Sequence, residues 1–163
     1  MNTSVTEQER NWAAVAHASS LLSVLVGILT GGLGALLLAL IPLGIYFAHR
    51  EKSRYVAYHA LQATTFQLIA LILYAVGLIV LLIVTVVGWI VVGLLLVVLV
   101  GVLLIPVALA ITLLLILFVL LYPLAAMVYA LYGAVQTGRG ADFQYHIIGE
   151  WLLDIEASWS RAS

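Results

Sequence analysis

The stretch that decides the fold begins as RYVAYHALQATTFQ at residues 54–67, and after Arg54 it continues to Gly138 without an Asp, Glu, Lys or Arg. From Tyr55 to Gly138 this uncharged run is 84 residues long, more than a soluble protein of this size can bury. The chain of 163 residues is 66% hydrophobic and 8% charged, against about 25% charged for an average soluble domain. The sequence therefore predicts an all-α integral membrane protein in which a bundle of transmembrane helices has the bilayer as its solvent.

Charge and cysteine content exclude several classes of function. The net charge of −1 provides no basic field for binding nucleic acid. Cysteine is absent, which excludes disulfides, thiolate nucleophiles and thiolate metal sites. The first ten residues, MNTSVTEQER, lack the positive region of a secretory signal, and Thr6 and Glu9 have the spacing of a helix capping box.

Two shorter apolar segments precede the long run. Residues 12–29 can cross a bilayer once and end at the glycine-rich turn TGGLG. Residues 36–48 are shorter and contain Pro42, so this arm either crosses the membrane or is re-entrant. We expect the two segments to form a helical hairpin.

A basic loop, HREKSR at residues 49–54, follows the hairpin. It holds three of the six basic residues, so the positive-inside rule places it, and the N-terminus two crossings earlier, in the cytoplasm. The three are Arg50, Lys52 and Arg54. We expect one membrane domain, 1–163, made of a cytoplasmic head (1–11), a helical hairpin (12–48), a basic cytoplasmic loop (49–58), long apolar spans (59–136) and an amphipathic tail (137–163).

The number of crossings depends on the 78 residues from His59 to Gln136. At about 1.5 Å per residue they would form roughly 117 Å of helix, against about 30 Å of hydrocarbon. Three crossings fit this length best, with breaks expected near Thr85–Trp89 and Leu104–Pro106. That gives five spans and an external C-terminus. Four spans with two long, kinked helices, which would keep the C-terminus in the cytoplasm, are the alternative.

The tail has the pattern of an amphipathic helix. Its apolar residues follow the helical period on one face, and acidic residues occupy the other, which is typical of a helix at the membrane–water interface. The apolar face consists of Ile148, Trp151, Leu152, Ile155 and Trp159.

Three motifs carry a resemblance to a known family. They are RNWAAVAHASSLL near the start, RYVAYHALQATTFQ, and YALYGAVQTGRGADFQYHIIGEWL near the end. In their order and spacing the chain resembles the bacterial Tic-twenty-like membrane proteins, whose plastid relatives are a channel-like component of the inner-envelope import translocon. The resemblance implies a helical membrane fold in the bacterial inner membrane and a link to protein translocation or insertion. The chain departs from the family at His146, where a proline is usual, and in the length of its apolar run.

Polar residues at the head of the long run form one candidate site. Tyr55, His59 and Gln62 share a face of a helix with Phe66, whereas Gln67 points elsewhere. His17 and Ser20 share a face of the first helix and could meet them. We expect this face to hold helices together by hydrogen bonds, and a water-filled cavity with a histidine gate is the alternative.

Catalytic and metal-binding patterns are missing from the sequence. No two histidines have metal-ligand spacing, no serine lies in a nucleophile elbow, and no pair of carboxylates lies in the apolar region. We therefore expect neither an enzyme nor a cofactor. The same shortage of intramembrane acids argues against ion-coupled transport.

A strip of small residues, Ala126, Ala130 and Ala134, repeats every four positions and lets another helix approach closely. Packing inside the bundle is the expected use, and a homo-oligomer or partner interface the alternative. The sequence thus predicts a small structural or channel-like membrane component. A small-solute or ion pore and an accessory subunit of a larger membrane complex remain as alternatives.

Overall fold

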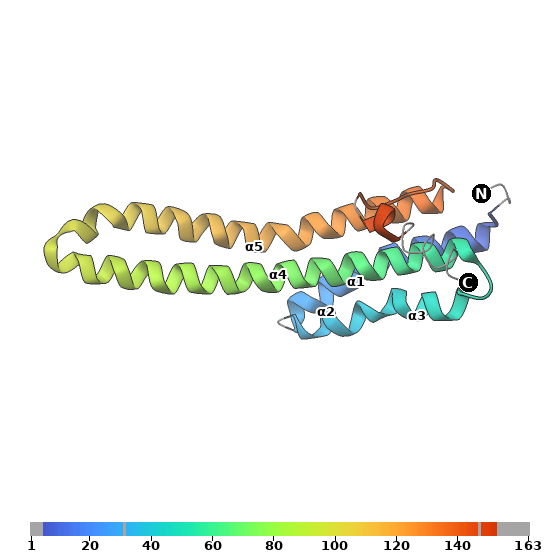
Figure 1. The fold of residues 1–163 in the computed structure, drawn as a ribbon, viewed down its shortest axis with the longest axis horizontal. Helices are drawn as coiled ribbons and strands as arrows, with labels where there is room; N and C mark the ends of the chain where they lie inside the picture. The colour runs from blue at the N-terminus through green and yellow to red at the C-terminus, as the bar shows by residue number, and fades with distance from the viewer. Residues whose placement is uncertain (1–4, 31, 147, 153–163) are drawn as a thin grey trace. The chain divides into compact units, whose positions relative to one another are not determined.

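The computed structural model of the protein describes residues 5–30, 32–146 and 148–152, and the described residues form helices and no strand (Figure 1). The elements are α1 (Glu7–Leu29), α2 (Leu33–Leu38), α3 (Leu40–His49), α4 (Arg54–Leu95), the 3₁₀ turn η1 (Leu96–Val98) and α5 (Val100–Gly138). Three stretches are long and apolar enough to cross a membrane: Glu7–Leu29, Arg54–Val98 and Val100–Gly138. The predicted all-helical class is confirmed for the described residues, and the helices fit a small membrane protein.

The chain divides into two compact units. Unit 1 comprises residues 1–71 and 126–163, and unit 2 comprises residues 72–125. Unit 1 thus contains α1 to α3, the first part of α4 and the last part of α5. Unit 2 is a hairpin made of the remaining parts of α4 and α5.

The first helix begins at the capping box that the sequence predicts. Thr6 Oγ1 accepts a hydrogen bond from the Glu9 amide at 3.3 Å, and the Glu9 carboxylate accepts one from the Thr6 amide at 2.8 Å. This cap starts the helix at Glu7, so the last residues of the predicted head 1–11 are already helical. Likewise α4 begins at Arg54, inside the predicted basic loop 49–58.

The second arm of the predicted hairpin is two helices rather than one. Helix α2 ends at Leu38, and α3 begins at Leu40. Pro42 lies in the first turn of α3, where a missing backbone N–H is tolerated, and the carbonyl that it cannot bond is that of Leu38. The proline therefore explains why the arm breaks there.

Small side chains bring α1, α3 and α4 close together inside unit 1. The core consists of Ala16, Ile45, Val56, Ala60 and Ala63, with Ile41 and Tyr46 packed against it. Three of the five core residues are alanines, which allow the backbones of α1 and α4 to approach closely. This close approach brings His17, which follows Ala16 on α1, into contact with His59, which precedes Ala60 on α4.

The breaks expected near Thr85–Trp89 and Leu104–Pro106 are wrong. Helix α4 continues through the first and α5 through the second, so residues 59–136 form two long helices, as in the four-span alternative. Pro106 removes one backbone hydrogen bond, which a long apolar helix tolerates. Unit 2 reverses direction instead at η1 and Leu99, whose φ of 61° is left-handed.

Gly101 permits this reversal. A Cβ at this position would lie 2.5 Å from both the amide nitrogen of Leu96 and the carbonyl oxygen of Val92. Only a residue without a side chain fits against the end of α4 in this way.

The charged residues that the structure describes, apart from Glu150, gather at one end of unit 1. Three segments form this charged end: residues 5–10, 49–54 and 139–142 (Figure 1). Ser53 Oγ donates a 2.6 Å hydrogen bond to Glu9, which joins the first two segments. Gly140, with a left-handed φ of 83° just after α5, lies against the Arg10 side chain and joins the third.

Candidate functional site

The polar residues predicted on α1 and α4 do meet. His17 and His59 are both fully buried, and His17 Nε2 lies 3.4 Å from His59 Nδ1. Their rings pack edge to face with centroids 5.5 Å apart. The helical spacing therefore identified two side chains that join α1 to α4.

A third segment completes this contact. Tyr145, which follows α5, places its hydroxyl 3.0 Å from His17 Nδ1 and is only 2% exposed. Its ring stacks on Phe66 of α4 with centroids 4.1 Å apart and planes 4° from parallel. Burial, and to a lesser extent Tyr129, raises the pKa of the Tyr145 hydroxyl, so this group remains a neutral phenol.

Gln62 holds the backbone of the same segment. Its Oε1 accepts a 3.2 Å hydrogen bond from the Tyr145 amide, and its side chain is fully buried. We call His17, His59, Gln62 and Tyr145 the polar cluster. His59 and Gln62, on one turn of α4, therefore contact both the His17 side chain of α1 and the segment that follows α5.

Two nitrogen atoms of the polar cluster have no hydrogen-bond partner. They are His59 Nε2 and Gln62 Nε2, and both are buried. If Tyr145 donates to His17 and His17 donates to His59, then His59 Nε2 carries a proton. With the opposite direction of donation, His59 Nε2 is an acceptor. Neither arrangement includes a hydrogen bond to a carboxylate, although the charge of Asp142 acts on His59.

Aromatic rings enclose the polar cluster. Phe143 meets His17 edge to face at 5.6 Å, Tyr55 meets His59 at 4.5 Å, and Tyr129 meets Tyr145 at 5.2 Å. The hydrogen bonds of the polar cluster are therefore made away from water, where a lost partner is costly.

A second buried contact lies two turns deeper in the bundle and was not predicted. Gln67 is 5% exposed, and its amide nitrogen donates to Ser19 Oγ at 2.8 Å. Its oxygen accepts a 3.0 Å hydrogen bond from Ser23. The expectation that Gln67 points elsewhere is correct for the His59 face but missed this contact, because Gln67 lies on a neighbouring face that also packs on α1.

Ser20 and Tyr55 differ in how they fit the predicted polar face, because Tyr55 contacts His59 and a neighbouring helix whereas Ser20 does neither through a hydrogen bond. Ser20 donates to the carbonyl of His17 on its own helix, so it does not join the polar residues of α4. Tyr55 donates a long hydrogen bond of 3.4 Å to the carbonyl of Thr137 at the end of α5. Tyr58, which sequence reasoning missed, donates to the carbonyl of Gly149 at 3.3 Å.

The basic loop lies at the charged end. Arg50 approaches Glu51 at 3.6 Å, in an exposed pair that contributes little to stability, and its guanidinium lies 5.3 Å from the centre of the Phe47 ring. Lys52 and Arg54 are exposed.

The alanine strip packs largely inside unit 1. Ala130 is 1% and Ala134 8% exposed, whereas Ala126 is half-buried. Gly133 between them lies directly against the Phe143 ring, where a Cβ would come within 2.5 Å. The contacts in this structure therefore favour packing of the alanine strip inside the bundle over an interface with another protein.

The tail is helical at 148–152. Within this turn Leu152 is buried, Ile148 is half-buried and Trp151 is 55% exposed. Ile155 and Trp159, the other members of the predicted apolar face, lie outside the described residues.

Chemically, the polar cluster is suited to fixing three segments together. Its members can donate and accept hydrogen bonds, and the hydrogen bonds of the two imidazoles go to each other and to Tyr145 rather than to a carboxylate. Within the described residues, no three His, Asp or Glu side chains gather closely enough to hold a metal ion.

Comparisons with known proteins identify the family. A family model described as the magnetosome magnetite crystal formation protein family matches residues 8–110, which include His17, His59 and Gln62 but not Tyr145. No curated protein and no solved structure matches the chain.

The match overturns the resemblance to the Tic-twenty-like proteins, and with it the link to protein translocation. The motifs on which that resemblance depended are short runs of small, aromatic and amide residues within apolar sequence, a composition that unrelated membrane helices share. Since the match covers more than half of the sequence, the chain belongs to the magnetosome magnetite crystal formation protein family.

Proposed function

We propose that this protein is a non-enzymatic membrane component that supports magnetite crystal formation by holding a packed helix bundle in the membrane where crystals form. The family match over residues 8–110 is the observation that carries the proposal. Three apolar stretches long enough to cross a bilayer support a membrane location. The polar cluster supports a packing role, because it joins α1, α4 and the segment after α5 through buried contacts.

We further propose that the protein crosses the membrane an even number of times. The start of α1, the loop before α4 and the segment after α5 meet at the charged end, with the 2.6 Å contact between Ser53 and Glu9 as the closest link. Charged side chains are costly inside hydrocarbon, so this end belongs at the membrane surface. The basic loop assigns it to the cytoplasmic side by the positive-inside rule.

The contacts favour packing over a pore at the polar cluster. The side chains of His59 and Gln62 have no exposed surface, and aromatic rings surround them. A hydrated path would need these groups to face water. The pore hypothesis therefore receives no support from the residues on which it was based.

Genetic complementation tests the proposal. A magnetite-forming bacterium that lacks its own member of this family would express the wild-type chain, and crystal dimensions would be measured by electron microscopy. We expect the wild-type chain to restore crystal size. Normal insertion into the membrane without any effect on the crystals would overturn the proposed function.

A conservative variant separates packing from imidazole chemistry. The double substitution His17→Gln and His59→Gln removes both imidazoles but keeps side chains that can donate and accept hydrogen bonds. If packing is the role, a stably inserted variant should retain most of the restoring effect. Complete loss of crystal formation at wild-type protein levels would show instead that proton transfer or metal binding by imidazole is required.

A further inference from the structure

The turn that joins the two arms of unit 2 is apolar throughout. It consists of η1 and Leu99, and α5 begins directly after it at Val100. Val97 is 86% and Leu99 76% exposed, and none of the side chains at residues 90–111 can form a hydrogen bond. The function proposed above does not use this turn.

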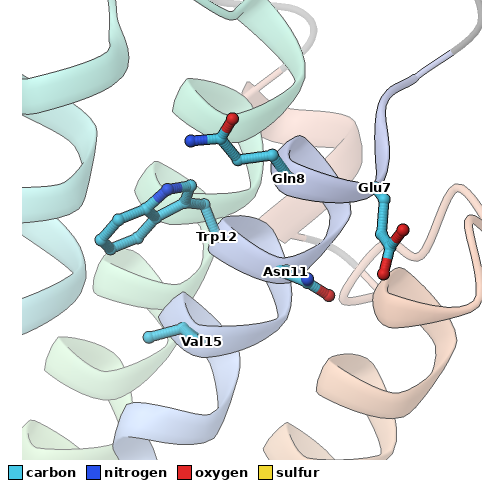
Figure 2. A pocket seen from close by; sticks show the side chains of 5 residues that line it. All are labelled: Glu7, Gln8, Asn11, Trp12 and Val15. Carbon is cyan, nitrogen blue, oxygen red and sulfur yellow. The ribbon is translucent and has the colours of Figure 1, made fainter.

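The start of α1 and the turn after α1 carry polar residues, in contrast. Figure 2 shows Gln8, Asn11 and Trp12 on the first turns of α1. At the other end of this helix, Thr30 Oγ1 accepts a 2.8 Å hydrogen bond from the Gly34 amide. Polar side chains and tryptophan are stable where a helix meets water and lipid headgroups. The turn of unit 2 has no residue of this kind.

The turn of unit 2 also pairs backbone groups within itself. The Leu99 amide donates to the Leu96 carbonyl at 3.0 Å, and the Val102 amide donates to the Leu99 carbonyl at 3.3 Å. Gly101 is buried against the end of α4, close to the carbonyl oxygen of Val92. Backbone groups in hydrocarbon must be satisfied inside the protein, because no water is present there. A tight turn with internal hydrogen bonds meets this requirement better than an open loop does.

The apolar surface of the turn continues that of both arms. Exposed apolar side chains follow one another from α4 through the turn into α5, among them Val91, Leu94, Val97, Leu99 and Leu103. A helix that is apolar all round is typical of a segment surrounded by lipid. A protein partner would instead single out one face of a helix, with small or polar residues along it. The surface therefore fits acyl chains better than it fits a second protein.

The arms are longer than a perpendicular crossing requires. The stretch Arg54–Val98 contains 45 residues, which is roughly 67 Å of helix against about 30 Å of hydrocarbon. A perpendicular hairpin would expose its apolar turn to water on the far side of the membrane, which is unfavourable in proportion to the apolar area exposed. Tilting or bending of the arms keeps the turn inside the membrane.

From these observations we propose that the turn of unit 2 lies among the acyl chains of the membrane that the protein spans and does not emerge on the far side. The bilayer interior is the partner of this surface. The inference concerns the arrangement in the membrane, so it holds whether or not the protein acts in crystal formation.

Depth-dependent quenching tests the proposal on the full-length protein reconstituted into lipid vesicles. Val97→Cys carries a polarity-sensitive fluorophore, and the chain has no native cysteine that would compete for the label. The quenchers are lipids with nitroxides on their acyl chains and, separately, aqueous iodide. The matched control is Leu33→Cys, because Leu33 is also apolar, is 72% exposed and lies beside the turn after α1. We expect nitroxide quenching at Val97→Cys to be at least about two-fold stronger than at Leu33→Cys, and iodide quenching to be weaker.

A second pair of variants needs no label. A carboxylate costs more among acyl chains than among headgroups, so Val97→Asp should lower the amount of membrane-inserted protein at least about three-fold more than Leu33→Asp does. Inserted protein is measured by immunoblotting of membranes washed with alkaline carbonate.

Several outcomes would overturn the proposal. Iodide quenching at Val97→Cys as strong as at Leu33→Cys would show that the turn reaches water. Protection from both quenchers would show that a protein surface, such as a second copy of the chain, covers the turn. Nitroxide quenching that requires added vesicles carrying the nitroxide lipid would place the turn in an apposed membrane. Equal losses of inserted protein in the two aspartate variants would contradict the proposed depth.

Discussion

The hydroxyl of Tyr145 provides the sharpest test of the polar cluster. Substituting Tyr145→Phe keeps the ring that stacks on Phe66 and removes only the group that lies 3.0 Å from His17 Nδ1. His17 has no exposed surface, so water cannot replace the lost partner. An unpaired buried polar group costs about 1–3 kcal/mol, whereas hydrogen bonds between membrane helices average about 0.6 kcal/mol.

We expect a loss of about 1–2 kcal/mol in the free energy of unfolding, because full burial of His17 favours the larger of these two effects. The assay is unfolding of the purified protein in mixed micelles by increasing dodecyl sulfate, followed by circular dichroism. The matched control is Tyr132→Phe. The Tyr132 hydroxyl accepts a 2.7 Å hydrogen bond from Gln136, but the residue is 53% exposed, so water can replace the bond and the change should stay within about 0.5 kcal/mol.

A double variant tests whether the two side chains act together. Combining His17→Leu with Tyr145→Phe removes both partners, so the cost should fall short of the sum of the single variants by at least about 0.5 kcal/mol. Equal effects of Tyr145→Phe and Tyr132→Phe, together with additive behaviour in the double variant, would refute the reasoning.

Two glycines give further predictions with internal controls, measured by the same unfolding titration. Gly133→Ala would place a methyl 2.5 Å from the Phe143 ring and should cost about 1–3 kcal/mol, whereas Gly44→Ala meets nothing within 4 Å and should be neutral or stabilising by up to about 1 kcal/mol. Gly101→Ala would bring its methyl within 2.5 Å of backbone atoms of α4, which cannot move as a side chain can, so it should destabilise unit 2 more than Gly93→Ala, which also meets nothing within 4 Å. Equal effects within either pair would contradict the packing described for that glycine.

The sequence was informative where a signal is local and periodic. The capping box of Thr6 and Glu9 depends on a spacing of three residues, and the structure confirms it. The shared face of His59 and Gln62 follows from the helical period, and His17 was the correct partner on α1. Local geometry was sufficient for Thr6 and Glu9, and for His59 and Gln62, because the two residues of each pair are only three positions apart in the sequence.

Contacts between segments far apart in the sequence could not be predicted from helical periodicity. Tyr145 is 128 residues from His17 and lies in a non-helical segment, so no periodicity connects the two. The signal that could have suggested such a residue was indirect: a buried glutamine such as Gln62 needs a partner, and aromatic residues follow the last long helix.

The position of the turn in unit 2 was missed for a different reason. The residues near Thr85–Trp89 and at Pro106 that were expected to break the helices are tolerated within long apolar helices. The turn itself consists of leucine and valine. What permits the reversal is the close approach of Gly101 to the end of α4, a tertiary contact without a local signature.

Cysteine accessibility tests the central claim, that one charged end on one side of the membrane sits above a dry polar cluster. The chain has no native cysteine, so single cysteines at Gln8, Lys52, Ala141 and Gln62 can be probed in intact and permeabilised cells with a membrane-impermeant thiol reagent. We predict that the first three, all exposed at the charged end or on the adjoining turn of α1, label only after permeabilisation, and that Gln62→Cys stays protected in both conditions. Labelling of Ala141→Cys from outside while Lys52→Cys remains protected would show an odd number of crossings, and ready labelling of Gln62→Cys would show that water reaches the polar cluster; either result would contradict the account.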